Sequence, residues 1–204
     1  MKSVLISIQP KWCELIASGT KTVEIRKTRP KMETPFKVYI YQTKESGRQF
    51  TVHRFNSIMR GETQHSGMGK VIGEFVCDEI KPFESEFVDD DCYEFIASLD
   101  YDEYGDATGF IEWTNDSDFS YASTDFYKKC CVKYEELKNY MGQGINEFYG
   151  WHISNLIIYE KPKELNEFRS YNVRTYREDG YIHPTHEIER PPQSWCYVEE
   201  GVQG

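Results

Sequence analysis

The sequence predicts an α+β fold: a small mixed β-barrel of five to six strands with two to three helices between them. Short runs with strand-like alternation recur along the chain, and far fewer segments show the helical period. No linker rich in Pro, Gly or Ser divides the 204 residues into comparable halves. We therefore expect one domain over residues 1–168, with insertions at 44–70 and 82–127. A C-terminal extension at 169–204 would supply a closing strand.

The first elements follow one another closely. Ser3–Ile8 is typical of a short buried strand, and Gln9-Pro10 then opens a helix, because proline is tolerated where the backbone N–H has no partner in any case. Gly19 is a natural helix stop. Thr22–Arg26 alternates, so Val23 and Ile25 are predicted to point one way and Thr22, Glu24 and Arg26 the other. Lys37–Thr43 is predicted to be the third strand.

The rest of the chain mixes strands with long insertions. Residues 44–70, with Arg48, Arg54 and Arg60, are predicted to be a long loop. The aromatic residues within 82–127 favour an ordered insertion over a disordered tail. Further elements are expected as a strand at Val71–Ile80, a helix at Tyr134–Met141, a strand at Tyr149–Tyr159, a helical turn at Lys163–Phe168 and the closing strand at Ser194–Val198.

Charge is distributed unevenly along the chain. The net charge is −10, which argues against a nucleic-acid partner at first sight. From Pro82 to Tyr127, however, there are 14 Asp or Glu and no Lys or Arg, whereas residues 1–81 hold 14 basic and 8 acidic side chains. A polyanion responds to local potential, and salt screens charges beyond about 8–10 Å. The sequence therefore predicts a basic face in the N-terminal part.

The cysteines and the apolar runs indicate the compartment. The six cysteines (Cys13, Cys77, Cys92, Cys130, Cys131, Cys196) include no CxxC pair, so we expect free thiols, no metal site and no cofactor. Val4–Ile8 is too short for the apolar core of a secretory signal, and no run approaches a membrane span. A cytoplasmic protein is the expectation.

One segment carries the candidate chemistry. It is the skeleton Gly19-x-Lys21-x-x-Glu24-x-Arg26, which follows a strand and an amphipathic helix. In this order the chain resembles the ASCH domain family, in a bacterial or phage-type form. The Gly73-Glu-Phe strand, and the Tyr149–Tyr159 strand with Lys-Pro beyond it, resemble the family as well. The resemblance covers about residues 1–43, 70–81 and 134–168.

The resemblance implies a PUA-like barrel over residues 1–168, with a ligand cleft beside the first helix. The motif residues Lys21, Glu24 and Arg26 would line that cleft. Lysine offers a point charge and arginine a planar fork, both suited to a phosphate or a base carbonyl. Trp12 could stack on a base, and His152 could line the cleft, although the sequence favours a structural role for both residues.

Three functions are compatible with the sequence. The first is a non-catalytic binder of RNA or of a modified nucleotide. The second is a hydrolase, either a ribonuclease or a nucleoside amidohydrolase, with Lys21 and Glu24 as the candidate catalytic residues. Acetylcytidine hydrolases of the family carry Thr where this chain has Glu24, and a carboxylate cannot repeat that hydroxyl attack. The third is a protein–protein adaptor that uses the acidic block 82–127.

Overall fold

The structure is a computed structural model that describes residues 2–44, 68–88, 93–98, 103–104, 111–114, 125–142, 147–170 and 186–200. It divides the chain into two compact units. Unit 1 comprises residues 1–18, 36–76 and 155–204, and unit 2 comprises residues 19–35 and 77–154. Among the described residues, no helix is long and apolar enough to cross a membrane. The predicted loop 44–70, with its three arginines, lies almost wholly outside the described residues.

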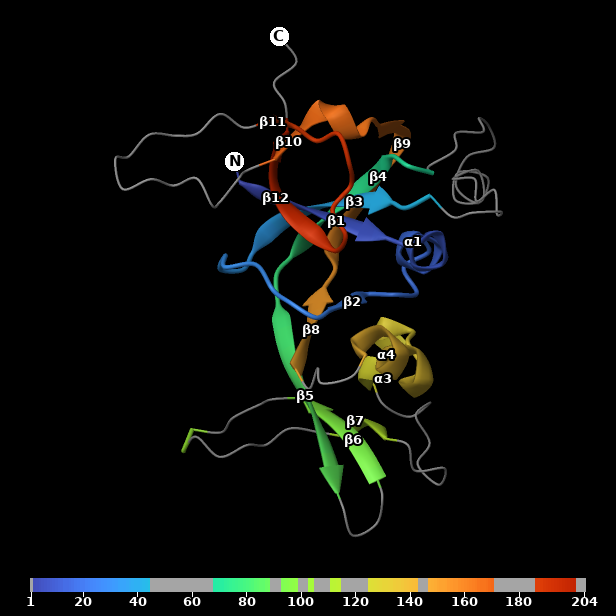
Figure 1. Cartoon of the computed structure of the whole chain (residues 1–204), viewed down its shortest axis with the longest axis vertical. Coiled ribbons are helices and arrows are strands. Elements are labelled where there is room, and N and C mark those ends of the chain that lie inside the picture. The colour runs from blue at the N-terminus through green and yellow to red at the C-terminus, as the bar shows by residue number, and fades with distance from the viewer. Residues whose placement is uncertain are drawn as a thin grey trace. The chain divides into compact units, whose positions relative to one another are not determined.

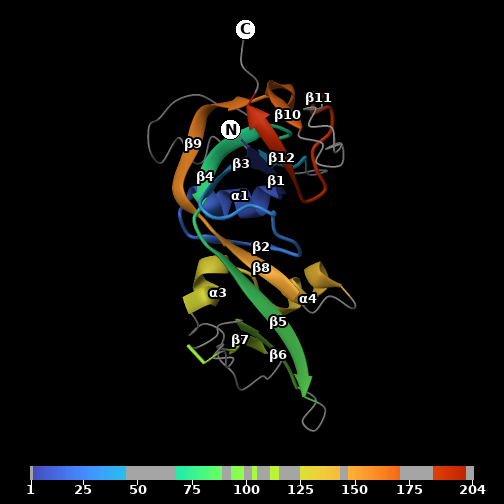
Figure 2. The same ribbon diagram turned by 90° about the vertical axis from the view of Figure 1, so that its left-hand side faces the viewer.

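Unit 1 is built on a seven-stranded sheet in the order β11-β10-β12-β1-β3-β4-β9 (Figures 1 and 2). The strands are β1 (Ser3–Ile8), β3 (Phe36–Gln42), β4 (Val71–Cys77), β9 (Ser154–Lys163), β10 (Phe168–Ser170), β11 (His186–Glu187) and β12 (Trp195–Glu200). β1 is buried along its whole length, pairing parallel with β3 and antiparallel with β12. The strand expected at Ser194–Val198 is thus confirmed, and it lies against the first strand of the chain.

The helix α1 (Pro10–Ala17) belongs to this unit and begins as predicted. Its apolar face buries Cys13 and Ile16, and Gly19 follows the helix with a φ of +74°, a conformation that favours glycine. Side chains of the sheet strands, together with Ile188, form an apolar cluster made of Leu5, Tyr39, Tyr41, Val71, Phe168, Ile188 and Val198. A single turn of 3-10 helix, η2 (Leu165–Glu167), stands where a helical turn was expected.

The neighbours of β4 explain why Gly73 and Glu74 stand at their positions in this strand. A Cβ atom on Gly73 would lie 2.4 Å from the backbone oxygen of Ile157, so only glycine lets β4 and β9 approach this closely. Glu74 accepts hydrogen bonds from Lys37 Nζ at 2.7 Å and from the Tyr159 hydroxyl at 2.5 Å. Burial raises the pKa of Glu74, but these two bonds and the charges of Lys37 and Lys163 outweigh it and lower the pKa overall.

Glu74→Gln is expected to destabilise the protein at pH 7 by about 1–2 kcal/mol, because a charge-assisted pair with the half-exposed Lys37 is lost. A carboxyl whose pKa is lowered by folding stabilises the fold above its unfolded pKa. That contribution disappears as the pH falls through the folded value. The difference between variant and wild type, measured by urea unfolding, should therefore shrink towards zero below about pH 4. Glu164→Gln is the control, since this exposed residue pairs with the half-exposed Lys70.

Unit 2 carries a five-stranded sheet in the order β2-β8-β5-β6-β7. Its strands are β2 (Val23–Arg26), β8 (Glu147–His152), β5 (Ile80–Val88), β6 (Tyr93–Ser98) and β7 (Ile111–Thr114), and its helices are α3 (Asp125–Cys130) and α4 (Tyr134–Met141). β6, β7 and most of β5 lie within the acidic block 82–127, and many of its other residues lie outside the described part of the chain. In the sheet order β2 and β7 form opposite edges.

The structure corrects the sequence prediction in two respects. The described residues form twelve strands in two open sheets, and not a closed barrel of five to six strands. Two segments expected as single strands are each divided: Val71–Ile80 ends as β4 at Cys77 before β5 begins, and Tyr149–Tyr159 is interrupted at Ile153. At that interruption Ile153 N–H bonds to Thr22 O at 2.8 Å and Asn155 has a φ of +48°, so each half joins a different sheet.

Candidate functional site

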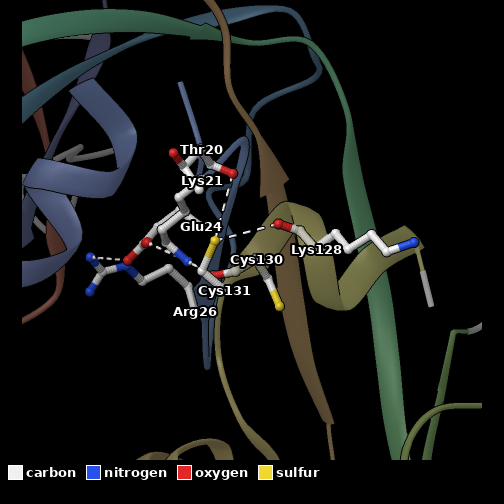
Figure 3. Close-up of polar contacts among 7 residues, drawn as sticks. All are labelled: Thr20, Lys21, Glu24, Arg26, Lys128, Cys130 and Cys131. Carbon is white, nitrogen blue, oxygen red and sulfur yellow. Dashed lines mark hydrogen bonds and ion pairs between the residues drawn. The ribbon is translucent and has the colours of Figure 1, made fainter. Parts of the chain in front are cut away.

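The three charged residues of the sequence motif lie together in unit 2 (Figure 3). Arg26 Nη2 lies 2.8 Å from Glu24 Oε1, and Lys21 Nζ lies 3.4 Å from Glu24 Oε2. A single carboxylate is thus shared by two cations, one at each oxygen. We call these three residues the motif cluster. Their convergence follows from the predicted alternation of β2, which places Glu24 and Arg26 on one face of the strand.

The motif cluster is buried. The side chains of Lys21, Glu24 and Arg26 are 1%, 7% and 7% exposed. Val23 and Ile25, which point the other way, are buried too, so both faces of β2 are covered. Burial makes the ion pairs geometrically fixed, because little solvent competes for them and the side chains have few alternative positions. Whether the cluster lines a ligand cleft stays a prediction.

A helix end holds Lys21 in place. Lys21 Nζ donates a 2.5 Å hydrogen bond to the carbonyl of Cys130, the last residue of α3. Thr22 N–H bonds to Lys129 O at 2.8 Å, which fixes the same helix end against the residues before β2. A cation at the C-terminus of a helix satisfies a carbonyl that lacks an intrahelical partner. This contact could not be predicted from local sequence patterns, because 109 residues separate the two partners.

Two adjacent cysteines stand at this helix end. Cys130 is buried, and burial raises the pKa of its thiol to about 11. Cys131 has a φ of +58°, and its thiol reaches the carbonyls of Thr20 and Lys128 at 3.6 and 3.4 Å (Figure 3). Both are free thiols, as are Cys13, Cys77 and Cys196, in agreement with the prediction for these five. A protonated thiol is a weak nucleophile, so the position of Cys130 favours a structural role.

The sheet register places Trp151 beside the motif cluster and His152 away from it. In β8, Trp151 lies opposite Glu24 and Tyr149 opposite Arg26, whereas His152 lies opposite Val23. Residues directly opposite on antiparallel strands share a face, so His152 is on the other face of the sheet from Glu24 and Arg26. There His152 Nδ1 lies 2.6 Å from Asp78 Oδ1, and both side chains are partly exposed. Hydrogen bonds from His152 and Ser154 outweigh the effect of burial and lower the pKa of Asp78.

Comparison with known proteins identifies the family. A family model described as the ASCH domain matches residues 6–175. The chain belongs to the ASCH domain family. The matched range contains the motif cluster and all of unit 2, so the acidic block lies within the span of the family match. The resemblance drawn from the motif is therefore confirmed.

Solved structures of ASCH proteins resemble this one. The crystal structure of ASCH from Zymomonas mobilis has a TM-score of 0.45 and 14% sequence identity, covering 97% of this chain and 87% of that one. A Tyr-to-Phe mutant of the same protein gives a TM-score of 0.46 and 14% identity, covering 98% and 91%. No curated protein matches this sequence significantly.

Trp12, the remaining candidate, belongs to the other unit of the ASCH domain. It lies on α1 and is half-buried, with Lys11 Nζ 4.1 Å from the centre of its ring. The motif cluster belongs to unit 2, so a joint role for Trp12 and the cluster stays a prediction. Alternation along the predicted strand puts Trp151 and His152 on opposite faces, but it does not show which of them faces the motif, and the sequence predicts no place there for Tyr149 or the end of α3. The pairing of β2 with β8 brings Trp151 and Tyr149 there, and the hydrogen bonds of Lys21 and Thr22 bring the end of α3, in each case across more than a hundred residues of sequence.

Proposed function

We propose that this ASCH domain binds RNA or a nucleotide in unit 2, with the motif cluster as the centre of the site and without turnover. The supporting observation is the guanidinium of Arg26, held 2.8 Å from Glu24 in a buried position. A fixed, planar cation loses little entropy when it binds a phosphate or a base carbonyl in the bidentate manner. A PUA-like arrangement of the domain is part of the same proposal.

Each member of the cluster has a separate role in this proposal. Arg26 contacts the ligand, and Glu24 orients the guanidinium. Lys21 fixes Glu24 from its other oxygen and is itself held by the Cys130 carbonyl. The cluster has two positive charges and one negative, so its own balance favours an anionic ligand.

The geometry of Glu24 favours binding over hydrolysis. Both of its carboxylate oxygens face a cation of the cluster. A general base must present an oxygen to the proton that it removes, at hydrogen-bond distance in the substrate complex. The Lys21-Thr-Val-Glu24 spacing also places no hydroxyl where acetylcytidine hydrolysis would need one. The adaptor role of the block 82–127 stays a prediction, since most of its side chains lie outside the described residues.

Arg26→Gln is expected to weaken binding of a labelled single-stranded RNA by about 10- to 150-fold, the cost of one charge-assisted contact of roughly 1.5–3 kcal/mol. Fluorescence anisotropy measures the affinity, and a salt titration shows whether phosphate contacts are lost. Lys161→Gln is the matched control, because it removes one positive charge from an exposed position in unit 1. This control should change the affinity by less than about twofold.

Chromatography of the same RNA, and separately of acetylcytidine, after incubation with the protein tests for turnover. Intact substrates are expected. RNA cleavage that disappears in Glu24→Gln would replace the binder with a ribonuclease. Deacetylation that disappears in Lys21→Ala would replace it with an amidohydrolase. Equal RNA affinity of wild type and a folded Arg26→Gln variant would contradict the proposed site.

A further inference from the structure

A short basic segment leaves the motif cluster at the end of β2. Residues 26–31 contain four cations, Arg26, Lys27, Arg29 and Lys31, and no acidic residue. Arg26 is buried, Lys27 is half-buried, and Arg29 and Lys31 are exposed. Positive charge therefore continues from the buried cluster onto the surface of unit 2. This is notable because the acidic block 82–127 belongs to the same unit.

Two tyrosines from other elements flank this segment. Tyr140, on α4, is 38% exposed, and Lys27 Nζ lies 5.1 Å from the centre of its ring. Tyr149, on β8, lies opposite Arg26 in the sheet and is half-buried. Its hydroxyl donates a hydrogen bond to the exposed Glu147, and this bond raises the pKa of Tyr149. The positive charge of Arg29 acts on the same pKa in the opposite direction. Two aromatic rings thus lie beside the first cations of the segment that follows β2.

We propose that Lys27, Arg29, Lys31, Tyr140 and Tyr149 form a binding track for single-stranded RNA, which extends the site centred on Arg26. This inference rests on the proposed function. Cations that follow the backbone and rings that stack on bases are the two components of single-strand recognition, and each stacked base contributes about 1–3 kcal/mol. A duplex cannot use the rings, because its bases are already stacked on one another.

The surrounding charges give the track a direction. Glu147 holds the hydroxyl of Tyr149, so a phosphate is disfavoured there and a base is favoured on the ring. The first turn of α4 carries Glu135 and Glu136, whereas Tyr140 stands in its last turn, next to Lys27. RNA that occupies Arg26 is therefore expected to continue past Lys27 and Tyr140, and not along the acidic start of α4.

The test compares two lengths of the same ligand, a labelled diuridylate and an oligouridylate of about ten nucleotides. Tyr140→Ala should weaken the longer RNA by about 5- to 150-fold and leave the affinity of the diuridylate unchanged. Tyr140→Phe, which keeps the ring, should bind both like wild type. Arg29→Gln should reduce the slope of log affinity against log salt by about 0.7 for the longer RNA. Lys161→Gln should leave the slope unchanged.

The outcomes separate the track from the site that it extends. If Arg26→Gln weakens both lengths while Tyr140→Ala and Arg29→Gln bind the longer RNA like wild type, the track is wrong and the proposed function stands. Equal affinity of wild type for both lengths would also overturn the track. If wild type binds neither length, the proposed function fails and the track fails with it. A length-dependent loss restricted to Tyr140→Ala and Arg29→Gln supports the track.

Discussion

Lys21→Met is expected to destabilise the protein by about 3–5 kcal/mol, the usual cost of removing one partner from a buried ion pair. Lys21 is 1% exposed, and its ammonium contacts both Glu24 and the carbonyl of Cys130. Methionine preserves the unbranched shape but supplies neither charge nor donor. The variant would leave the Glu24 carboxylate with one of its two cations in the cluster, and the end of α3 would lose its hydrogen bond.

Urea unfolding, combined with hydrogen exchange of the β2 and β8 amides, measures this loss in unit 2. The double variant Lys21→Met/Glu24→Gln should recover part of the stability, because it removes the buried charge that the single variant leaves behind. Lys161→Met is the control for a surface lysine and should unfold like wild type. If Lys21→Met unfolds at the wild-type urea concentration, the contacts of Lys21 contribute nothing to the fold.

Trp151→Ala is expected to cost about 3–5 kcal/mol as well, through lost packing and the cavity left behind. Trp151 is fully buried, the largest side chain of that kind among the described residues. It lies between Glu24 of β2 and Ile80 of β5 in the sheet register. The cavity would therefore open beside the motif cluster, and RNA binding should weaken together with stability.

Circular dichroism during urea unfolding measures the stability, and anisotropy measures the RNA affinity. Trp151→Phe should lose less of both, because it fills most of the volume. Trp195→Ala provides the comparison in unit 1, where the ring is only half-buried and packs edge-on against Tyr197. An equal loss of stability in the two alanine variants would show that the complete burial of Trp151 does not increase its contribution to the free energy of unfolding.

The sequence predicted correctly those helices and strands that can be recognised from a local pattern of apolar residues. The strand Ser3–Ile8 and the helix Tyr134–Met141 have the predicted bounds, since an apolar run and a helical period need no distant partner to be recognised. The strands β5 to β7 were not predicted. The sequences of β6 and β7 do alternate, as in Tyr93-Glu94-Phe95 and Ile111-Glu112-Trp113, but runs this short within a block of 14 acidic residues were not recognised as strands. The ends of β4 and β8 depend on which of the two sheets each residue joins. Strands that are distant in the sequence determine this, so a local pattern cannot predict it.

The candidate site shows the same division. Alternation in β2 was enough to predict that Glu24 and Arg26 share a face and that Val23 and Ile25 are buried. The burial of Lys21 was not predictable, because the Cys130 carbonyl comes from a helix more than a hundred residues away. His152 lies opposite Val23, and this pairing puts its side chain on the face of the sheet away from Glu24. The pairing register cannot be predicted from a single sequence.

The place of β1 between β3 and β12 has a consequence for the synthesis of the protein. The ribosome releases Ser3–Ile8 long before one of its two neighbours, Trp195–Glu200. At about 5–20 residues per second, the nascent chain spends roughly ten seconds or more with one side of this apolar strand unpaired. Sheets closed by contacts so distant in sequence also form slowly. We therefore expect the nascent chain to be most prone to aggregation during this interval.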